Sequence, residues 1–301
     1  MRVMMTGGTG MIGSPLAKRL LEKGHEVLIL SRSHIGEGSS SKLRFVKWNG
    51  RTLGEWVDQL AGVDAIINLA GENIGAMRWS KKRKDLILGS RVTAGETLTQ
   101  AIGKASIKPK VFIQASAIGF YGTNDQGLIT EESLSGNDFL ADISKKWERS
   151  SFEIESMGIR RVIIRTGVVL SRQEGALGRM LLPFKFYIGG PLGSGRQMVS
   201  WIHLEDEISA ICFLLENGNT RGIYNLTSPA PAPNAELGKL IARITHRPFW
   251  LPVPEFALRF LLGEMSTVVL DGQSVIPERL LEAGFRFKFK DISSALMDIL
   301  A

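Results

Sequence analysis

Three glycines with a spacing of three residues stand near the start of the chain, in Thr6-Gly-Gly-Thr-Gly-Met-Ile-Gly13. This motif lies between a short apolar run and an apolar helical segment. Such glycines let a pyrophosphate approach backbone N–H groups at a helix N-terminus, where the helix dipole favours anions. Gly7 suits the tight turn, Gly10 the close approach of phosphate, and Gly13 the packing of the helix on its strand. We therefore expect a nucleotide to contact Gly7, Thr9, Gly10, Met11, Ile12 and Gly13.

A second chemical signal comes directly after the next apolar run, Glu26–Leu30, where Ser31 and Arg32 stand. Sites that prefer NAD usually place Asp or Glu here, on the adenosine ribose hydroxyls. A carboxylate would repel a 2′-phosphate, whereas the planar guanidinium of Arg binds phosphate oxygens well. The residues therefore predict NADP(H) as the cofactor. The alternative is that Arg32 is simply a solvated loop residue.

Alternation of apolar runs and helical patterns indicates the elements that position these residues. Strands are expected at Val3–Met5, Val27–Leu30, Leu43–Val46, Ala65–Leu69, Val111–Gln114 and Val162–Arg165. Helices are expected at Ser14–Glu22, Lys82–Gly103 and Asp138–Ser156. This order is typical of a parallel sheet covered on both faces. The predicted fold class is α/β, a Rossmann-type doubly wound parallel sheet with a smaller, mostly helical C-terminal cap.

The pattern changes after Leu170 to a segment rich in Gly and Pro. A strand at Met198–His203, a helix at Glu205–Glu216 and a strand at Gly222–Leu226 follow it, and helices dominate from Asn234 onward. We expect a dinucleotide-binding domain over residues 1–170, to which residues 199–226 return. Residues 171–198 and 227–301 are expected to form the substrate and cap region.

Composition excludes several classes of protein. The chain has 301 residues, 44% of them hydrophobic, a net charge of +7 and a single cysteine, Cys212. Because the basic residues are spread along the chain without interleaved aromatics, we expect no nucleic acid partner. No apolar stretch has the length of a membrane span, no spacing suits a metal, and one cysteine suits a reducing compartment. The expected location is the cytoplasm, without membrane contact.

Several motifs together resemble the extended short-chain dehydrogenase/reductase superfamily, the group of NAD(P)-dependent epimerases and dehydratases. Within it the chain resembles the atypical epimerase family proteins, which carry a small C-terminal domain of unknown function. Besides the glycine turn, the motifs are Asn68-Leu-Ala-Gly-Glu-Asn73, Gly89-Ser-Arg91, Ala115-Ser-Ala-Ile-Gly-Phe-Tyr-Gly122, Arg165-Thr-Gly-Val-Val-Leu170, Gly189-Gly-Pro-Leu-Gly-Ser-Gly-Arg-Gln197 and Ser200-Trp-Ile-His203. The resemblance covers essentially the whole chain.

The resemblance implies further cofactor contacts at the ends of the predicted strands. Ser31 and Arg32 would meet the 2′-phosphate. The other positions that match cofactor contacts of the family are Leu69, Ala70, Gly71, Arg91, Ala115, Ser116, Gly167 and Val168.

The usual catalytic residues of the superfamily, a Ser or Thr and a Tyr followed four residues later by Lys, are missing. Alignment on Tyr121-Gly122 places Ala117 at the hydroxyl position, and alignment on Trp147-Glu148 places Leu140 and Ser144 at the Tyr and Lys positions. Tyr121 belongs to a turn that the superfamily commonly shows, and we interpret it as structural.

Other groups could perform the acid/base step. His203, at a strand end expected to face the cleft, has a suitable side chain, although such a residue often orients the strand-to-helix turn instead. Ser116 and Lys145 are further candidates. Expected substrate contacts are Gly193, Arg196 and Gln197, on a loop that should overhang the nicotinamide, and Trp201, which should line the same cleft from the strand that follows.

Two hypotheses therefore remain open. The first is an NADP(H)-dependent, epimerase-like oxidoreductase acting on an unknown small molecule. The second is a non-catalytic NADP(H)-binding protein that regulates or senses. Either is compatible with a monomer or a homodimer, and a polar, closed pocket beside the nicotinamide would favour the enzyme.

Overall fold

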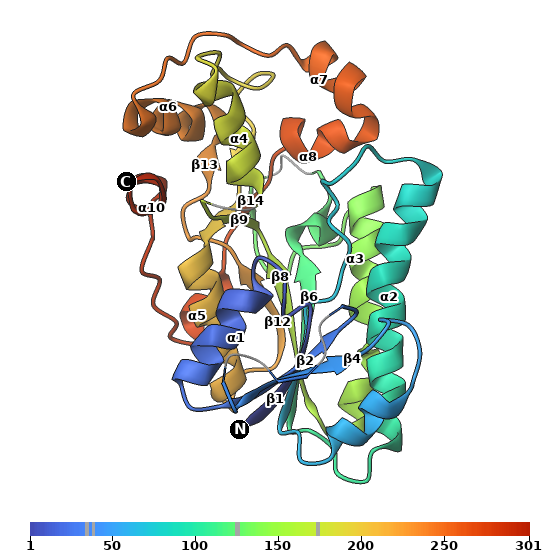
Figure 1. Ribbon diagram of the computed structural model, residues 1–301. Helices are drawn as coiled ribbons and strands as arrows, with labels where there is room; N and C mark the ends of the chain where they lie inside the picture. The colour runs from blue at the N-terminus through green and yellow to red at the C-terminus, as the bar shows by residue number, and fades with distance from the viewer. Residues whose placement is uncertain (34–35, 38–39, 124–126, 173–174) are drawn as a thin grey trace.

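The computed structural model describes residues 1–33, 36–37, 40–123, 127–172 and 175–301. Within these ranges the main sheet has seven parallel strands and one short antiparallel edge strand, in the order β12-β8-β6-β5-β1-β2-β4-β3 (Figure 1). The strands are β1 (Arg2–Thr6), β2 (Glu26–Ser31), β3 (Gly36–Glu37), β4 (Leu43–Lys47), β5 (Ala65–Asn68), β6 (Val111–Ala117), β8 (Arg160–Thr166) and β12 (Gly222–Leu226).

The strand order reverses at β1, which pairs with β2 on one side and β5 on the other. In open parallel sheets, ligands bind beyond the carboxyl ends of the strands at such a switch point. The glycine turn follows β1 directly, so the fold places it at this crevice. The expected Rossmann-type doubly wound sheet is confirmed.

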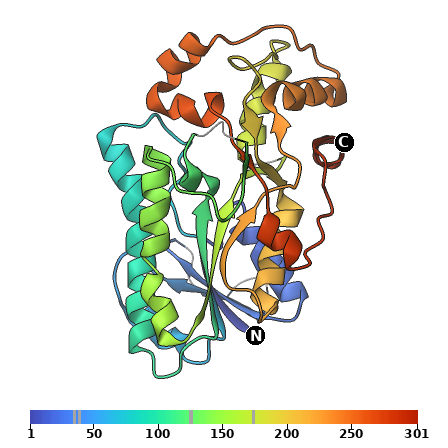
Figure 2. The ribbon, with the colours of Figure 1, turned by 180° about the vertical axis from the view of Figure 1, so that it is seen from behind.

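Helices cover both faces of the sheet, as Figures 1 and 2 show. On one face lie α1 (Gly13–Glu22) and α5 (Leu204–Glu216), and on the other lie α2 (Lys81–Lys104) and α3 (Phe139–Arg149). The strands between them are almost entirely buried, which explains their near-continuous apolar sequences. Short 3₁₀ segments are η1 (Glu55–Leu60), η2 (Ile118–Tyr121), η3 (Phe152–Met157) and η4 (Gly263–Ser266).

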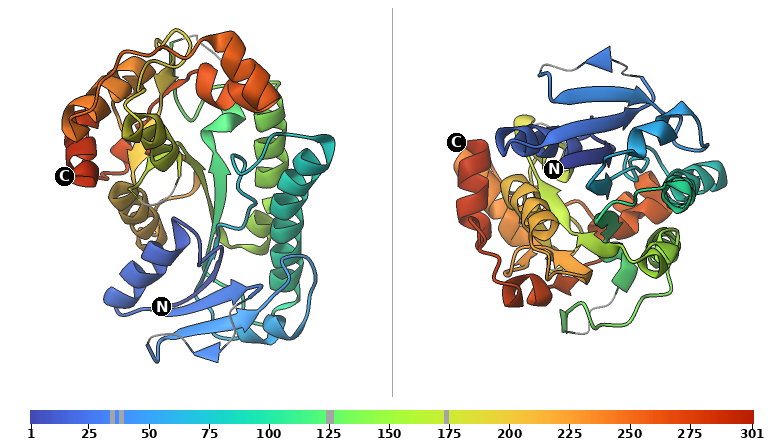
Figure 3. Two further views of the ribbon diagram at one scale, coloured as in Figure 1. Left: turned by 45° about the horizontal axis from the view of Figure 1, so that its top comes forward. Right: turned by 90° about the horizontal axis from the view of Figure 1, so that it is seen from below.

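The C-terminal cap arches over the carboxyl ends of the strands (Figure 3, left). Its core joins α4, α6 and α10 around the indole of Trp201. The helices of this region are α4 (Ala176–Lys185), α6 (Asn234–Thr245), α7 (Glu255–Leu262), α8 (Thr267–Leu270) and α10 (Ile292–Leu300). The short helix α9 (Glu278–Glu282) instead packs on β12, and its Leu280 belongs to the core of the main sheet. Small strand pairs complete the cap region, β10 (Met198–Val199) with β13 (Ala232–Pro233), β11 (Trp201–His203) with β9 (Val168–Leu170), and β14 (Ser274–Val275) with β7 (Leu128–Ile129).

Two expected elements differ from the structure. The strand expected at Met198–His203 divides at Ser200, because β10 and β11 pair with different partners. Of the strands in the returning segment, β12 joins the main sheet, whereas β10 and β11 belong to small separate pairs. The helix expected at Asp138–Ser156 ends at Arg149, and the chain continues as η3. Apolar patterning predicts that a strand is buried, but it does not show which other strand a short strand pairs with.

Candidate functional site

The glycine turn has the geometry of a phosphate cradle. Gly7 has φ of +66°, and a Cβ on it would lie 2.6 Å from the carbonyl oxygen of Leu69. A Cβ on Gly13 would overlap the carbonyl oxygen of Gly7, so α1 can begin this close to the turn only because its first residue is glycine. The amide of Gly10 donates to the Gly7 oxygen at 3.0 Å, while a Cβ there would meet nothing nearer than 3.4 Å. The turn is therefore closed on its inner side and open on its outer side.

A buried polar chain fixes the strand ends beneath the cradle. Thr6 Oγ1 donates to Asn68 Oδ1 at 2.6 Å, and Asn68 Nδ2 donates to Gln114 Oε1 at 3.1 Å. The amide of Ala70 donates back to Thr6 Oγ1 at 3.1 Å. These bonds join β1, β5 and β6, so they hold the predicted contact residues after β5 in register with the turn. No motif described above includes these hydrogen bonds, although one polar residue within each of three neighbouring apolar strands is a visible signal.

Arg32 lies at the carboxyl end of β2, with its side chain 76% exposed and its Nη1 3.5 Å from Glu72 Oε1. The other Glu72 oxygen lies 3.3 Å from Arg83 Nη1. The sequence analysis did not anticipate this carboxylate beside Arg32. Since Glu72 is shared by two arginines, the local charge is still positive, and the Arg32 guanidinium projects into solvent.

Arg91 comes to the loop after β5, as its predicted role requires. Its Nη1 donates to the carbonyl oxygens of Glu72 and Ile87 at 3.0 and 3.1 Å, and a Cβ on Gly71 would lie 3.0 Å from its Cζ. Burial lowers the pKa of Arg91 to about 10, which still leaves the guanidinium charged at neutral pH. Arg91 thus holds the backbone at Gly71 and Glu72 in place.

The start of α4 closes over the crevice. Gly175 packs so closely on Met11 that a Cβ there would lie 2.9 Å from the Met11 sulfur. Arg179 donates to the carbonyl oxygen of Gly75, in the loop after β5. The segment from Gly175 to Arg179 therefore touches both walls of the predicted nucleotide site.

Ser116 is part of a buried ionic network. Its Oγ donates to Glu148 Oε1 at 2.7 Å, and the same carboxylate accepts from Arg165 Nε and Nη2 at 2.8 and 3.0 Å. Arg165 Nη1 donates to the hydroxyl of Tyr121, which donates to Asn225 Oδ1 at 2.7 Å. Burial raises the pKa of Tyr121. Both hydroxyls are thus committed to structure, which agrees with the interpretation of Tyr121 and argues against Ser116 as a proton donor.

The side chains at the positions of the missing Tyr and Lys cannot act on a substrate, because one is apolar and the other bonds to the backbone of its own helix. Leu140 packs in an apolar cluster with Trp79, Ile87 and Met265. The hydroxyl of Ser144 donates to the carbonyl oxygen of Leu140 at 2.8 Å. No group at these two positions can transfer a proton to a substrate.

His203 does not face the cleft, which corrects the expectation for this residue. Its Nδ1 accepts from the amide of Glu205 at 3.0 Å and caps α5, and its ring packs on Phe289 with 4.0 Å between the centroids. Its Nε2 lies 3.4 Å from Asp298 Oδ2. Burial lowers the pKa of this histidine. The alternative that a histidine here orients the strand-to-helix turn therefore describes the structure.

The expected substrate loop is built into the cap. Trp201 is completely buried and donates from Nε1 to the carbonyl oxygen of Ala230, so it cannot touch a substrate and that expectation is corrected. Gln197 Nε2 donates to the carbonyl oxygens of Leu192 and Val269, both at 3.0 Å. Gly193 (φ +57°) packs on Leu270, whereas Arg196 is exposed.

The remaining predicted contacts occupy the sheet edge. Ala115 is buried within β6, beside Ile164 of β8. A Cβ on Gly167 would lie 2.5 Å from the carbonyl oxygen of Ser200, and Val168 is half-buried in β9. Gly167 therefore allows the close approach of β11 to this edge.

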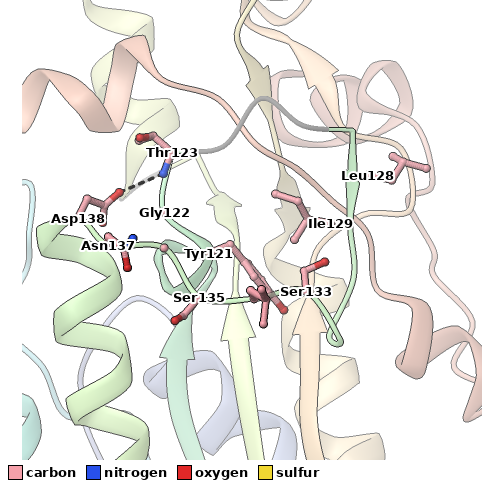
Figure 4. A pocket seen from close by; sticks show the side chains of 11 residues that line it. Tyr121, Gly122, Thr123, Leu128, Ile129, Ser133, Ser135, Asn137 and Asp138 are labelled. Carbon is pink, nitrogen blue, oxygen red and sulfur yellow. Dashed lines mark hydrogen bonds between the residues drawn. The ribbon is translucent and has the colours of Figure 1, made fainter.

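A pocket of about 680 Å³ opens beside the start of α3 (Figure 4). Its lining is mostly polar, and Asp138 caps α3 while accepting from the amide of Thr123 at 3.0 Å. Lys145 is not one of the lining residues, but its Nζ donates to the carbonyl oxygen of Gly136, which is, at 3.2 Å. The residues around the pocket are Tyr121, Gly122, Thr123, Leu128, Ile129, Ser133, Leu134, Ser135, Gly136, Asn137 and Asp138.

Metal and membrane features are not seen in the described ranges. No three His, Cys, Asp or Glu side chains there gather as a metal site requires. None of the helices described combines the length and apolarity needed to cross a bilayer.

The doubly wound sheet and its glycine turn define a dinucleotide-binding protein of the Rossmann class. Residues 3–145 match the NAD dependent epimerase/dehydratase family, and residues 253–299 match a domain of unknown function, DUF1731. The chain is 43% identical over its whole length to the epimerase family protein YfhF of Bacillus subtilis, covering 98% of that protein. It belongs to the epimerase family proteins, and it is an NAD(P)-binding, epimerase-like protein.

Two further relatives extend the comparison. The chain is 39% identical to the epimerase family protein SDR39U1 homolog, chloroplastic, of Arabidopsis thaliana, with coverage of 100% of the chain and 87% of that protein. The crystal structure of human epimerase family protein SDR39U1 (isoform 2) with NADPH superposes with a TM-score of 0.86 at 33% identity, covering 100% and 99% of the two chains. The resemblance inferred from the motifs is confirmed.

Proposed function

We propose that the protein is an NADP(H)-dependent oxidoreductase that acts on a small molecule. The observation that carries the choice of cofactor is Arg32, an exposed guanidinium at the carboxyl end of β2, the strand whose Leu30 pairs with Thr6 at the start of the glycine turn. A 2′-phosphate there would compete with Glu72 for this guanidinium and would gain charge-assisted hydrogen bonds. The NADPH in the structure of human SDR39U1 supports the same choice.

The residues of the site fit this cofactor. The backbone from Thr9 to Ile12 would hold the pyrophosphate, because Gly7 and Gly13 leave the approach clear. Ser31 and Arg32 would meet the adenosine end, and the backbone at Gly71, held by Arg91, would line the ribose. When bound, the nicotinamide supplies a hydride to a carbon atom of the substrate or accepts one from it.

Among the three candidate acid/base groups, Lys145 is the one that makes a hydrogen bond to a residue lining a pocket. Ser116 is bound to Glu148, and His203 caps α5. Lys145 makes a hydrogen bond to one carbonyl oxygen, that of Gly136, which a substrate oxygen can replace. In the reduction direction, the Lys145 ammonium would donate a proton to the oxygen that becomes negative, and solvent would return a proton to Lys145.

One observation favours a second function, a non-catalytic NADP(H)-binding protein that regulates or senses. The position of the usual tyrosine holds Leu140, and both Leu140 and Met265 of the cap pack on an apolar cluster that contains Trp79 and Ile87. A cap closed by apolar contacts suits retention of a bound nucleotide.

The test is NADPH consumption by the full chain in the presence of a panel of small carbonyl compounds. We expect at least one compound to accelerate it, and Lys145→Ala to slow that reaction roughly 100-fold. Lys146→Ala is the matched control, because Lys146 pairs with Asp142 on the exposed side of α3. If no compound accelerates consumption although NADPH binds, the non-catalytic function is favoured. Equal rates for the two lysine variants would exclude Lys145 as the proton donor.

The state of the one thiol supports a proposal for the compartment. Cys212 is the single cysteine of the chain and is free and buried in α5, so it needs no oxidising environment. We propose the cytoplasm.

A further inference from the structure

Several large apolar side chains of the cap are exposed, just after α4, in the link before α7 and on α7 itself. Six of them, all between 55% and 80% exposed, define what we call the cap face: Phe186, Tyr187, Trp250, Phe256, Phe260 and Leu261. The helices α4 and α7 and the link before α7 form this end of the molecule, opposite the N-terminus (Figure 1). Exposed apolar groups of this size gather on monomeric proteins mainly at interaction sites.

Hydrogen bonds and a cation–π contact fix the backbone and side chains around Tyr187 and Trp250. Trp250 Nε1 donates to the carbonyl oxygen of Tyr187 at 2.9 Å, and the Trp250 amide donates to Gly189 at 2.8 Å. Tyr187 has φ of +63°, a conformation that non-glycine residues rarely adopt, and the guanidinium of Arg247 lies 4.3 Å from its ring centroid. The loop is therefore held in a defined shape with its aromatic rings outward.

The helix α7 carries the other half of the cap face. Leu258 is buried and anchors the helix, while Phe256 and Phe260 lie one turn apart on the exposed side. The neighbouring row holds Glu255 and Arg259, which form an ion pair with 2.8 Å between Oε1 and Nε. The exposed surface of α7 is thus an apolar row beside a row with one acid and one base.

The area of the cap face is that of one side of a protein interface. An aromatic side chain offers about 150–250 Å² for burial, so five that are more than half exposed present on the order of 650 Å². A stable interface buries about 800 Å² on each partner. The exposed aromatic area of the cap face is thus most of what one side of such an interface needs, and it lies above the roughly 300–600 Å² of the largest apolar patch on a typical monomer.

We propose that the cap face binds a second copy of this chain in a two-fold symmetric dimer. Two-fold packing requires a self-complementary surface. When two α7 helices pack antiparallel about a point between Phe256 and Phe260, the phenylalanine rows meet, and Glu255 of each copy faces Arg259 of the other. A bilayer suits this surface less well, because the one acid and one base of α7 cancel and the neighbouring Glu264 is paired with Lys84, so α7 carries no excess positive charge for anionic lipids.

Sedimentation velocity of the full chain over micromolar concentrations tests the proposal. We expect a dimer for the natural sequence and a monomer, with at least a tenfold weaker association, for the double variant Phe256→Asp with Phe260→Asp. Phe152→Asp is the matched control, because Phe152 is 63% exposed on η3, outside the cap face. NADPH affinity and circular dichroism should not change in any of these variants, since all three positions are exposed.

A charge exchange tests the antiparallel arrangement separately. Glu255→Arg or Arg259→Glu alone should weaken the dimer, and the two together should restore it, since each changed residue again faces an opposite charge. A monomer at every concentration, or a dimer that survives the double phenylalanine variant, would overturn the proposal. So would a monomer that cosediments with phosphatidylglycerol vesicles through the same phenylalanines, because the occupant would then be a lipid surface.

Discussion

At the scale of single residues, Glu207 is a buried acid that no motif or spacing in the sequence indicates. It lies in α5, completely shielded from solvent, and its Oε1 accepts from Thr166 Oγ1 at 2.8 Å. Its Oε2 has no hydrogen-bond partner among the described residues. Burial raises the pKa of Glu207 to about 8, so the carboxyl group is neutral at pH 7. An acid in a helix pattern is normally assigned to the solvent side, and only the packing of α5 on β8 shows otherwise.

Glu207 predicts a dependence of stability on pH. Because the pKa is about 8 in the folded state against 4.5 for an ordinary glutamate, unfolding releases a proton between these values and stability falls as pH rises. Between pH 6 and pH 8 this residue should lower the free energy of unfolding by about 2–3 kcal/mol. Glu207→Gln keeps the acceptor for Thr166 and removes the titration. Urea unfolding at both pH values should therefore show a smaller decline for the variant, and an equal decline would contradict a neutral Glu207.

At the scale of elements, the β1–turn–α1 unit could be predicted because its signals are local. Gly7 and Gly13 are required by contacts within a few residues or with the adjacent strand end. The network around Arg165 could not be predicted in the same way. Its members come from β6, η2, α3, β8 and β12, so no spacing in the sequence reveals it. An arginine within the apolar run of β8 was the available signal that a buried acid must lie opposite.

Glu148 joins three of these elements, and its removal should be costly. Glu148→Gln would leave the buried Arg165 guanidinium without its counter-charge, and we expect a loss of about 3–5 kcal/mol in the free energy of unfolding. Urea denaturation measures this loss. Glu153→Gln, on the exposed side of η3, should change the same quantity by less than about 0.5 kcal/mol. A loss below about 1 kcal/mol for Glu148→Gln would show that the network does not hold β6, α3 and β8 together.

At the scale of the whole molecule, the sheet and cap follow from the strand–helix alternation, but the placement of the substrate loop does not. The glycine-rich segment suggests a flap over the cofactor, whereas Gln197 and Trp201 lie within the packing of the cap. The contacts that do reach the nucleotide crevice come from Gly175 and Arg179. These depend on how α4 crosses the ends of β1 and β5, which is a property of the assembled fold.

Calorimetric titration with NADPH and NADH tests the central claim most directly, using the natural chain, Arg32→Asp and the exposed control Arg286→Asp. A charge-assisted contact with the 2′-phosphate contributes about 1.5–3 kcal/mol, so NADPH should bind roughly 10- to 100-fold more tightly than NADH. Arg32→Asp should abolish this preference by weakening NADPH alone, and Arg286→Asp should keep it. Equal affinities for the two nucleotides, or a preference for NADPH that survives Arg32→Asp, would contradict the assignment of this site to NADP(H).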